Sequence, residues 1–382
     1  MRLLIYLLSV IVVIGCSYEE KNNILSDSKM DKKIVWEVGG HLPAQTGMEK
    51  NIGVSGLLYG SLQDKYIVAG GGGNFPYEST LNGGAKKLYS DIYMLEDNNG
   101  ALQVIEHINW ENEIGHGASI TTKEGIYYIG GASNPQADDD ILFISLKDNK
   151  LSVEKVGDLP FTFQNGAAVE KDGKLYIIAG RQNGKAANEV YQYDLSTKET
   201  KKLSPVPNQE TRTQPIAQLL NGSIYVFSGA DSIAYTDGYK YDFSKDAWEQ
   251  VSDISITNKE NITLAGGVSI KLNESEMVVM GGVNKNIYDN AVYNLNNLKG
   301  EELSDFKYKY FTSDPYEFKL NSDILIYNSK TDSWKTLGEV PFNPTCGQGL
   351  ILIGNKIYFI SGEIKAGIRT DKMYIGTILK RM

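Results

Sequence analysis

The sequence predicts an all-β protein: a six-bladed β-propeller whose last blade is closed by an N-terminal strand. The 382 residues include 39 glycines and 24 tyrosines but only 10 prolines, which suits many short strands joined by tight turns. A unit also recurs along the chain: Gly with apolar residues, a turn, an apolar run ending in Gly, and a strand carrying Asp and Tyr. Recurrence of one supersecondary unit favours a repeat architecture over an irregular fold.

The spacing of this repeat identifies the type of blade. The glycine that closes the second strand of each unit recurs at steps of 61, 49, 49, 53 and 80 residues: Gly70, Gly131, Gly180, Gly229, Gly282 and Gly362. A period of about 49 residues matches the four-stranded Kelch blade. Six such sheets stacked around an axis cover one another and leave only short edges. A β-sandwich is the alternative, but it gives no reason for a constant period.

The last unit is one strand short. It supplies strands at 349–352, 357–360 and 373–375, whereas the segment 34–38 stands alone before the first unit. We therefore expect 34–38 to complete the last blade and to join the two ends of the chain without a covalent bond.

Two steps of the repeat are long because of insertions at 71–90 and 284–320. Both lie between the second and third strands of their blades, so they emerge on the same face. Long loops on a rigid scaffold commonly carry function, although surface elaboration is the alternative. The 284–320 segment is rich in Tyr and Phe, and a mobile lid over the site is one role open to it.

The first 15 residues are predicted to be a lipoprotein signal peptide. Arg2 supplies a positive charge, and the apolar segment 3–14 is too short for a comfortable transmembrane helix. A glycine stands directly before Cys16, as at a lipoprotein cleavage site. An ordinary signal peptide that happens to contain a cysteine is the alternative.

Lipidation of Cys16 defines the expected organisation of the rest of the chain. Residues 16–33 then form a polar tether and residues 34–382 the propeller, held in the bacterial periplasm or at the outer membrane by a lipid anchor. Cys346 is left without a partner for an intrachain disulfide. A monomer is the expected state because no heptad pattern is present, with a dimer as the alternative.

Charge and motif content argue against several functions. The net charge of −9 opposes binding to a nucleic acid. With three histidines and no Cys/His spacing of a zinc site, neither a metal site nor the ligand set of a copper oxidase is expected. The glycine run 70–73 lacks the Lys-Ser/Thr of a phosphate loop, and no Gly-x-Ser-x-Gly motif stands out.

The candidate catalytic residues are Glu363 and Arg369. Glu363 directly follows the second strand of the last blade, and Arg369 lies further along the same loop, so both can reach the mouth of the central channel. Arg binds a carboxylate through paired hydrogen bonds, and Glu can carry a proton. The alternative is a salt bridge that only holds the loop together.

Other polar residues on the same face are candidates for binding a polyhydroxylated ligand. They are Arg212, Gln214, Asn284, Asn74, His116, and Gln164 with its neighbour Asn165. Taken singly, each also suits a role in stabilising a loop, and for His116 the two roles are equally open.

The motifs resemble those of the Kelch-type N-acetylneuraminate (sialic acid) mutarotases, also termed epimerases. The most specific is Gly-Glu-Ile-Lys-Ala-Gly-Ile-Arg-Thr-Asp at 362–371; further likeness lies at 72–76, 86–92 and 281–287. The resemblance covers nearly the whole mature chain. In the better-known members the chain begins at the blade that is third here, so this sequence resembles a cyclically permuted branch, an order that a closed ring tolerates.

The resemblance implies an isomerase that interconverts the α and β anomers of free sialic acid without a cofactor. It makes Glu363 the acid/base residue and Arg369 the group that binds the sugar carboxylate, with Arg212 and Gln214 as substrate contacts. A propeller on the cell envelope that binds a glycan or a protein without catalysis is the second hypothesis. An isomerase or lyase for another acidic sugar is the third.

Overall fold

The computed structural model describes residues 32–380 apart from 133–136, 209, 257–258 and 260–261. The predicted signal peptide, Cys16 and nearly all of the tether therefore lie outside the described residues. Within them, no helix combines the length and the apolar character needed to cross a membrane.

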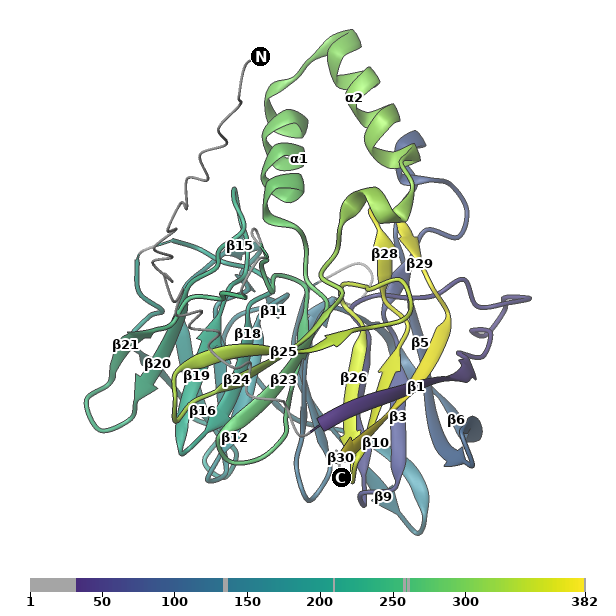
Figure 1. Ribbon diagram of the computed structural model, residues 1–382. Helices are drawn as coiled ribbons and strands as arrows, with labels where there is room; N and C mark the ends of the chain where they lie inside the picture. Colours follow the sequence, from purple (N-terminus) through teal and green to yellow (C-terminus); the bar gives the residue numbers. More distant parts are fainter. Residues whose placement is uncertain (1–31, 133–136, 209, 257–258, 260–261, 381–382) are drawn as a thin grey trace, which may run out of the picture.

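Antiparallel sheets follow one another along the chain (Figure 1). From the innermost strand outward, the first three sheets contain β2 (Leu58–Leu62), β3 (Tyr66–Gly70), β5 (Lys87–Asn98) and β6 (Ala101–Ile114); β7 (Ala118–Thr121), β8 (Ile126–Ala132), β9 (Ala137–Lys147) and β10 (Lys150–Asp158); and β12 (Ala167–Lys171), β13 (Lys174–Ile178), β16 (Val190–Asp194) and β17 (Thr200–Leu203). The next three contain β18 (Ile216–Leu220), β19 (Ser223–Phe227), β20 (Gly238–Asp242) and β21 (Ala247–Val251); β22 (Val268–Lys271), β23 (Glu276–Met280), β24 (Asp323–Asn328) and β25 (Ser333–Glu339); and β26 (Gly349–Ile353), β27 (Lys356–Ile360), β30 (Lys372–Lys380) and β1 (Lys32–His41).

The loops between these strands contain further short strands and helices. They are β4 (Gly73–Asn74), β11 (Phe163–Gln164), β14 (Arg181–Gln182), β15 (Lys185–Ala186), β28 (Glu363–Lys365), β29 (Ile368–Arg369), the 3-10 helices η1 (Thr80–Asn82) and η2 (Pro315–Phe318), and the helices α1 (Lys285–Asn297) and α2 (Gly300–Thr312).

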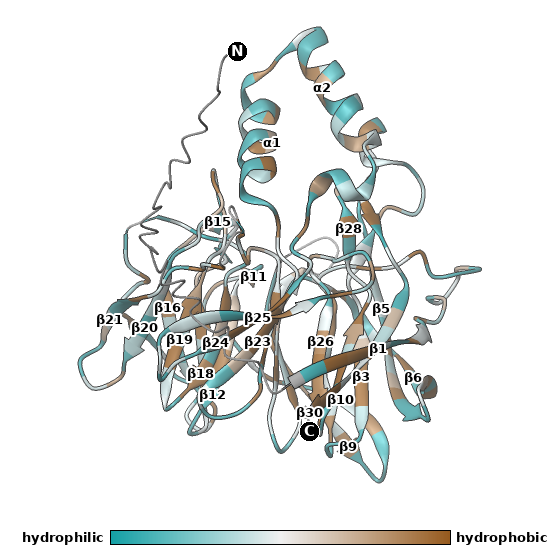
Figure 2. Ribbon diagram, viewed as in Figure 1, coloured by the Kyte–Doolittle hydropathy of each residue, from teal (hydrophilic) through white to brown (hydrophobic). Residues whose placement is uncertain are grey.

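The sheets close into a ring. Their innermost strands contact one another in the order β2, β7, β12, β18, β22, β26 and back to β2. Each pair of neighbouring sheets encloses its own hydrophobic cluster, so apolar residues concentrate in the strands (Figure 2). The prediction of an all-β Kelch-type propeller is confirmed.

The N-terminal strand completes the last sheet, as predicted. β1 pairs with β30 in antiparallel register, with Trp36 opposite Gly376. A Cβ at Gly376 would lie 2.8 Å from the Trp36 ring, and the same ring packs edge-on against Phe342 with centroids 5.2 Å apart. The two ends of the described chain are therefore held together by a strand pair and an aromatic contact.

Aspartates in the repeat link one sheet to the previous one. Asp246 accepts hydrogen bonds from the hydroxyl of Tyr241 at 2.5 Å and from the backbone N–H of Ser204 in the preceding sheet at 2.9 Å. Trp248 completes the link by donating its indole N–H to the Ser204 carbonyl at 2.9 Å. The next sheet repeats this link, because Asp332 accepts from the hydroxyl of Tyr327 at 2.8 Å and from the backbone N–H of Ser252 at 2.9 Å.

The long insertion lies where the sequence predicted it, between β23 and β24, but its central part is helical. Helices α1 and α2 form a hairpin that stands above the propeller (Figure 1). Asn284 caps α1, its side chain accepting the N–H of Ile287 at 3.2 Å. The hairpin is fixed at both ends, because Asp289 of α1 accepts the backbone N–H of Ala234 at 2.7 Å and Lys365 of β28 donates to carbonyls at the end of α2.

Candidate active site at the propeller mouth

A closed ring of backbone hydrogen bonds frames the mouth of the channel. Each member stands two residues before an innermost strand, and each donates its N–H to the carbonyl of the ring member from the preceding sheet, at 2.6–3.2 Å. All six adopt left-handed φ values between +52° and +76°. The ring residues are Gly56, His116, Asn165, Gln214, Gly266 and Gly347.

The ring has a polar half and a glycine half. His116, Asn165 and Gln214 from three consecutive sheets carry side chains, whereas the other three members are glycines. Left-handed backbone is costly for a residue such as Gln, and such strain tends to be retained at functional sites. The ring thus places three polar side chains on one side, whereas on the other side a Cβ at Gly56 would lie 2.3 Å from His116 Nδ1 and a Cβ at Gly266 would lie 3.1 Å from Cys346 Cβ.

A cavity of about 410 Å³ lies at this mouth. It is lined by the ring, the starts of the innermost strands and the loops of the first and last sheets, with Tyr288 and Tyr310 from the helical hairpin. Its size is in the usual range for a small-molecule site, and its wall mixes apolar groups with a few charged ones.

Glu363 and Arg369 meet in this cavity, as the sequence predicted. The short strands β28 and β29 place the two residues opposite each other, and their side chains form an ion pair. Gly362 permits the sharp approach to β28, because its φ is +111° and a Cβ would lie 2.3 Å from Thr345 Oγ1. Mutual backbone hydrogen bonds with Cys346, at 2.8 and 2.9 Å, then fix Glu363.

The environment raises the proton affinity of the Glu363 carboxylate. Burial raises the pKa of Glu363 above its ordinary 4.5, and this outweighs the opposite effects of Arg369, Lys86 and the Gly367 N–H. A carboxyl group in this state exchanges a proton more readily near neutrality than an exposed one.

Arg369 is nearly buried and is positioned for more than the ion pair. Its guanidinium lies 4.7 Å from the centroid of the Phe75 ring, and its side chain is 3 % exposed. Its Nη1 has no hydrogen-bond partner among the described residues. The N–H groups on Nη1 are therefore buried donors without a partner among the described residues, which is unusual for a buried polar group.

Two neighbouring groups in the cavity, the Tyr310 hydroxyl and the Cys346 thiol, stay uncharged. Burial is the main cause that raises the pKa of the Tyr310 hydroxyl and of the Cys346 thiol to about 12 each. The Cys346 thiol is therefore a poor nucleophile, whereas Tyr310 keeps a proton that it can donate in a hydrogen bond.

Among the predicted binding residues, the structure brings His116 and Gln214 to the cavity wall as ring members. Gln164 is one residue away from the ring and pairs with Arg181 through β11 and β14. Its neighbour Asn165 lines the cavity instead.

Two further candidates hold loops and are not part of the described cavity wall. Asn74 is buried, donating to the Gly53 carbonyl and accepting from the Tyr89 hydroxyl, both at 2.7 Å. Asn284 caps α1. Their side-chain hydrogen bonds support roles in loop structure.

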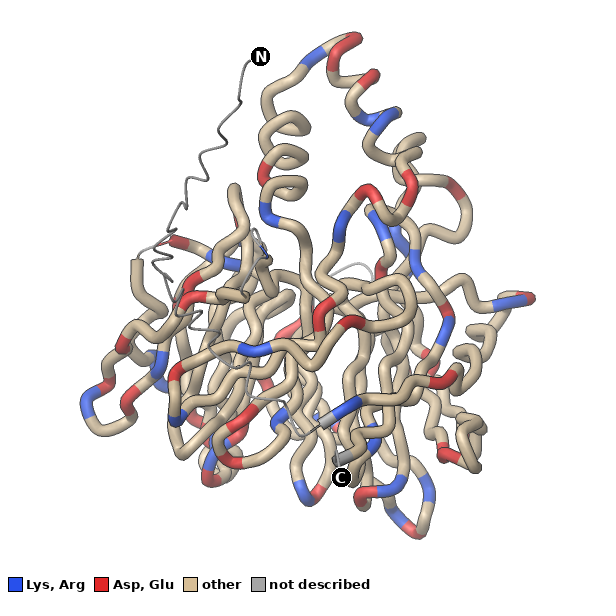
Figure 3. Tube along the Cα trace, in the orientation of Figure 1, with Lys and Arg blue, Asp and Glu red and all other residues tan. Residues whose placement is uncertain are grey.

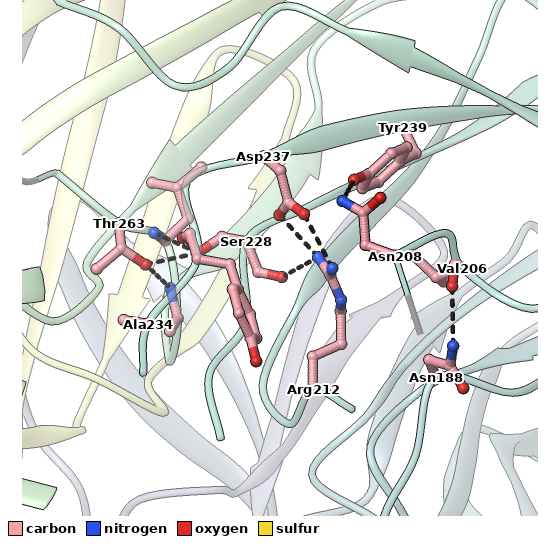
Figure 4. A network of polar contacts seen from close by, with 12 residues as sticks. Asn188, Val206, Asn208, Arg212, Ser228, Ala234, Asp237, Tyr239 and Thr263 are labelled. Carbon is pink, nitrogen blue, oxygen red and sulfur yellow. Dashed lines mark hydrogen bonds and ion pairs between the residues drawn. The ribbon is translucent and has the colours of Figure 1, made fainter. Parts of the chain in front are cut away.

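Arg212 belongs to a buried network away from the described wall of the cavity (Figure 4). Its side chain is 0 % exposed and forms paired bonds to Asp237 at 2.8 and 2.9 Å, with a third bond to the Ser228 carbonyl at 3.0 Å. The rings of Tyr235 and Tyr239 cover the guanidinium. This placement supports a structural role for Arg212, whereas its expected contact with substrate stays a prediction.

The residues of the cavity that were not predicted as site residues from the sequence include Tyr310 and Lys86. Tyr310 reaches the cavity from α2, and Lys86 reaches it from the loop before β5. The Lys86 ammonium lies 3.1 Å from His116 Nε2. Neither residue falls at a fixed position of the repeat, so the period of the sequence gave no signal for them.

Comparison with known proteins identifies similar chains. Residues 154–382 match the family described as N-acetylneuraminate epimerase. The N-acetylneuraminate epimerase of Salmonella enteritidis PT4 is 31 % identical over 227 residues, which is 57 % of this chain and 56 % of that protein. That of Yersinia pestis is 30 % identical over 237 residues, 58 % of this chain and 57 % of the relative. The matched region thus spans little more than half the length of these relatives.

A solved structure of YjhT resembles this chain with a TM-score of 0.50 and 24 % identity, over 58 % of this chain and 66 % of the other. At this identity the likeness bears on the fold alone.

Proposed function

Because the chain belongs to the N-acetylneuraminate epimerase family, we propose that it interconverts the α and β anomers of N-acetylneuraminic acid. The observation that carries the proposal is the Glu363–Arg369 pair in the mouth cavity, where burial raises the pKa of the carboxyl group. Both residues lie within the segment that matches the family. Substrate and mechanism for this chain are our inference from that match and that geometry.

The matched segment begins in β10, so it covers the last four sheets except for β1 and leaves nearly all of the first two outside. A cyclic permutation would account for this extent, because a linear comparison can follow only one of the two exchanged segments.

Anomer exchange requires the sugar ring to open and close. The anomeric hydroxyl loses a proton, the ring oxygen gains one, and the bond between the ring oxygen and the anomeric carbon breaks to leave a ketone. Glu363 as a carboxylate accepts the hydroxyl proton and delivers it to the ring oxygen, directly or through water, so no proton is consumed overall. Rotation next to the ketone exposes its other face, and the reverse steps close the ring as the other anomer.

The neighbouring side chains support this proton transfer. Arg369 orients the Glu363 carboxylate and offers its free Nη1 to a substrate oxygen. Tyr310, held protonated, can donate a hydrogen bond to the sugar, and the hairpin that carries it limits the access of bulk water.

Replacing Glu363 by Gln tests the assignment. Glu363→Gln keeps the shape and a hydrogen-bonding oxygen but cannot take up the proton, so we expect the anomer-exchange rate to fall at least 100-fold. The rate is measured by NMR on α-N-acetylneuraminate freshly released by a sialidase. Glu189→Gln, in a partly exposed ion pair with Lys202, is the matched control and should exchange at the wild-type rate. An unchanged rate in Glu363→Gln would remove this residue from the mechanism.

We also propose that Cys16 is lipidated and holds the enzyme at the bacterial envelope. The support is the sequence pattern around Cys16. Cell fractionation of the full chain should place it with the membranes and Cys16→Ser in a soluble fraction. Equal membrane association of both proteins would contradict the anchor.

A further inference from the structure

Lys86 is a charged cavity residue to which the proton transfer assigns no role. It directly precedes β5 and stays accessible at the mouth of the cavity, and its Nζ lies 3.1 Å from His116 Nε2. Gly73 leaves room for the aliphatic part of the Lys86 side chain, because a Cβ at position 73 would lie only 3.0 Å from Lys86 Cδ. Lys86 and His116 both lie outside the segment that matches the family.

His116 holds the Lys86 ammonium group without neutralising it. An ammonium group only donates hydrogen bonds, so Nε2 of His116 accepts and the ring proton resides on Nδ1. Burial, followed by the positive charges of Lys86 and Arg369, lowers the pKa of His116 to about 3. The imidazole is therefore neutral at physiological pH. Its Nε2 accepts a hydrogen bond from the Lys86 ammonium group and so orients Lys86.

The described cavity wall has more positive than negative charge. Three cations, Lys86, Lys365 and Arg369, face one carboxylate, Glu363, whereas charges of both signs are interspersed over the outer loops and helices (Figure 3). Lys365 is bound to carbonyls at 2.6 and 3.1 Å, and Arg369 is paired with Glu363. Within this described wall, Lys86 is the cation that forms neither an ion pair with a carboxylate nor a hydrogen bond to a carbonyl oxygen, although its charge acts on Glu363 at longer range.

Lys86 and Arg369 approach the same part of the cavity. Both lie against the Phe75 ring, Arg369 at 4.7 Å and Lys86 Nζ at 6.0 Å from its centroid. A ligand carboxylate placed there would receive the free donors of Lys86 and relieve the repulsion between the two cations.

We propose that Lys86 is a substrate-positioning residue, which binds the carboxylate of the anionic sugar and selects it over an uncharged sugar. His116 fixes the ammonium group, and Arg369 remains mainly the partner of Glu363. This inference rests on the proposed function for the identity of the sugar, although the charge argument holds for any sugar acid of this size.

Equilibrium binding to full-length protein tests the proposal, with N-acetylneuraminate and its uncharged methyl ester as probes in titration calorimetry. Lys86→Met should weaken binding of the acid at least tenfold and leave the ester unchanged, and Lys86→Arg should recover most of the loss. Lys87→Met is the control, because the Lys87 ammonium lies against Tyr77 and Tyr89. In exchange kinetics the loss should appear mainly in KM.

Each other outcome has a definite meaning. Unchanged affinity of Lys86→Met for the acid, or an equal loss for acid and ester, overturns the role of Lys86 in binding the carboxylate. A third outcome is a wild-type protein that binds the acid but does not exchange anomers, with weaker binding in Lys86→Met. That outcome would refute the proposed function and support this inference. A wild-type protein that binds neither probe would refute both.

Discussion

Replacing Arg212 by Met separates a structural role of this residue from a role in substrate binding. The substitution keeps an unbranched apolar side chain but removes both bonds to Asp237 and the bond to the Ser228 carbonyl. Removing one partner of a buried ion pair costs about 3–5 kcal/mol. The Asp237 side chain is 17 % exposed, so water partly compensates and we expect the lower end, about 3 kcal/mol.

Urea denaturation followed by tryptophan fluorescence measures this loss, and exchange kinetics measure KM on the same samples. Lys202→Met, which breaks the partly exposed pair with Glu189, is the control and should cost less than about 1 kcal/mol. The expected result for Arg212→Met is a lower denaturation midpoint with KM close to wild type at a temperature where the variant is folded. An unchanged midpoint with a tenfold higher KM would refute the structural interpretation.

Three further predictions concern pH, closure of the ring and the mouth. Because burial raises the pKa of Glu363, this carboxylate becomes protonated at a higher pH than an ordinary Glu. As the pH decreases through that pKa, kcat/KM should fall, with a midpoint above 4.5. A midpoint at or below 4.5 would contradict this. Trp36→Ala should lower the free energy of unfolding by about 2–3 kcal/mol. The control is Val38→Ala, at a side chain that is 61 % exposed, which should lower it by less than about 0.5 kcal/mol. Equal denaturation midpoints for the two variants would argue against closure by β1. Gln214→Gly should keep the left-handed ring and unfold within about 1 kcal/mol of wild type but raise KM, and an unchanged KM would exclude Gln214 as a substrate contact.

The fold was predictable because the information for it is periodic. The recurring glycines mark the end of each second strand, and the orphan strand at 34–38 could be assigned by counting strands in the last unit. Glu363 and Arg369 were predictable as a pair because one short hairpin carries both. The β28–β29 hairpin places Glu363 and Arg369 opposite each other, so their closeness in sequence leads directly to their closeness in space.

The rest of the site depends on side-chain direction and on contacts between distant loops. Arg212 and Gln214 are two residues apart, yet Arg212 enters a buried network and Gln214 joins the ring at the mouth. The position two residues before each innermost strand would have selected Asn165 over Gln164. Lys86 had no such marker, because it reaches the cavity from a long loop whose path the repeat does not determine.

The most direct test of the account is anomer exchange by the wild-type full-length chain. Sialidase-released α-N-acetylneuraminate is mixed with catalytic amounts of the protein, and the α and β signals are followed by NMR near neutral pH. The account predicts equilibration well above the spontaneous rate, in proportion to the protein concentration. Equilibration at the spontaneous rate at every protein concentration would contradict it.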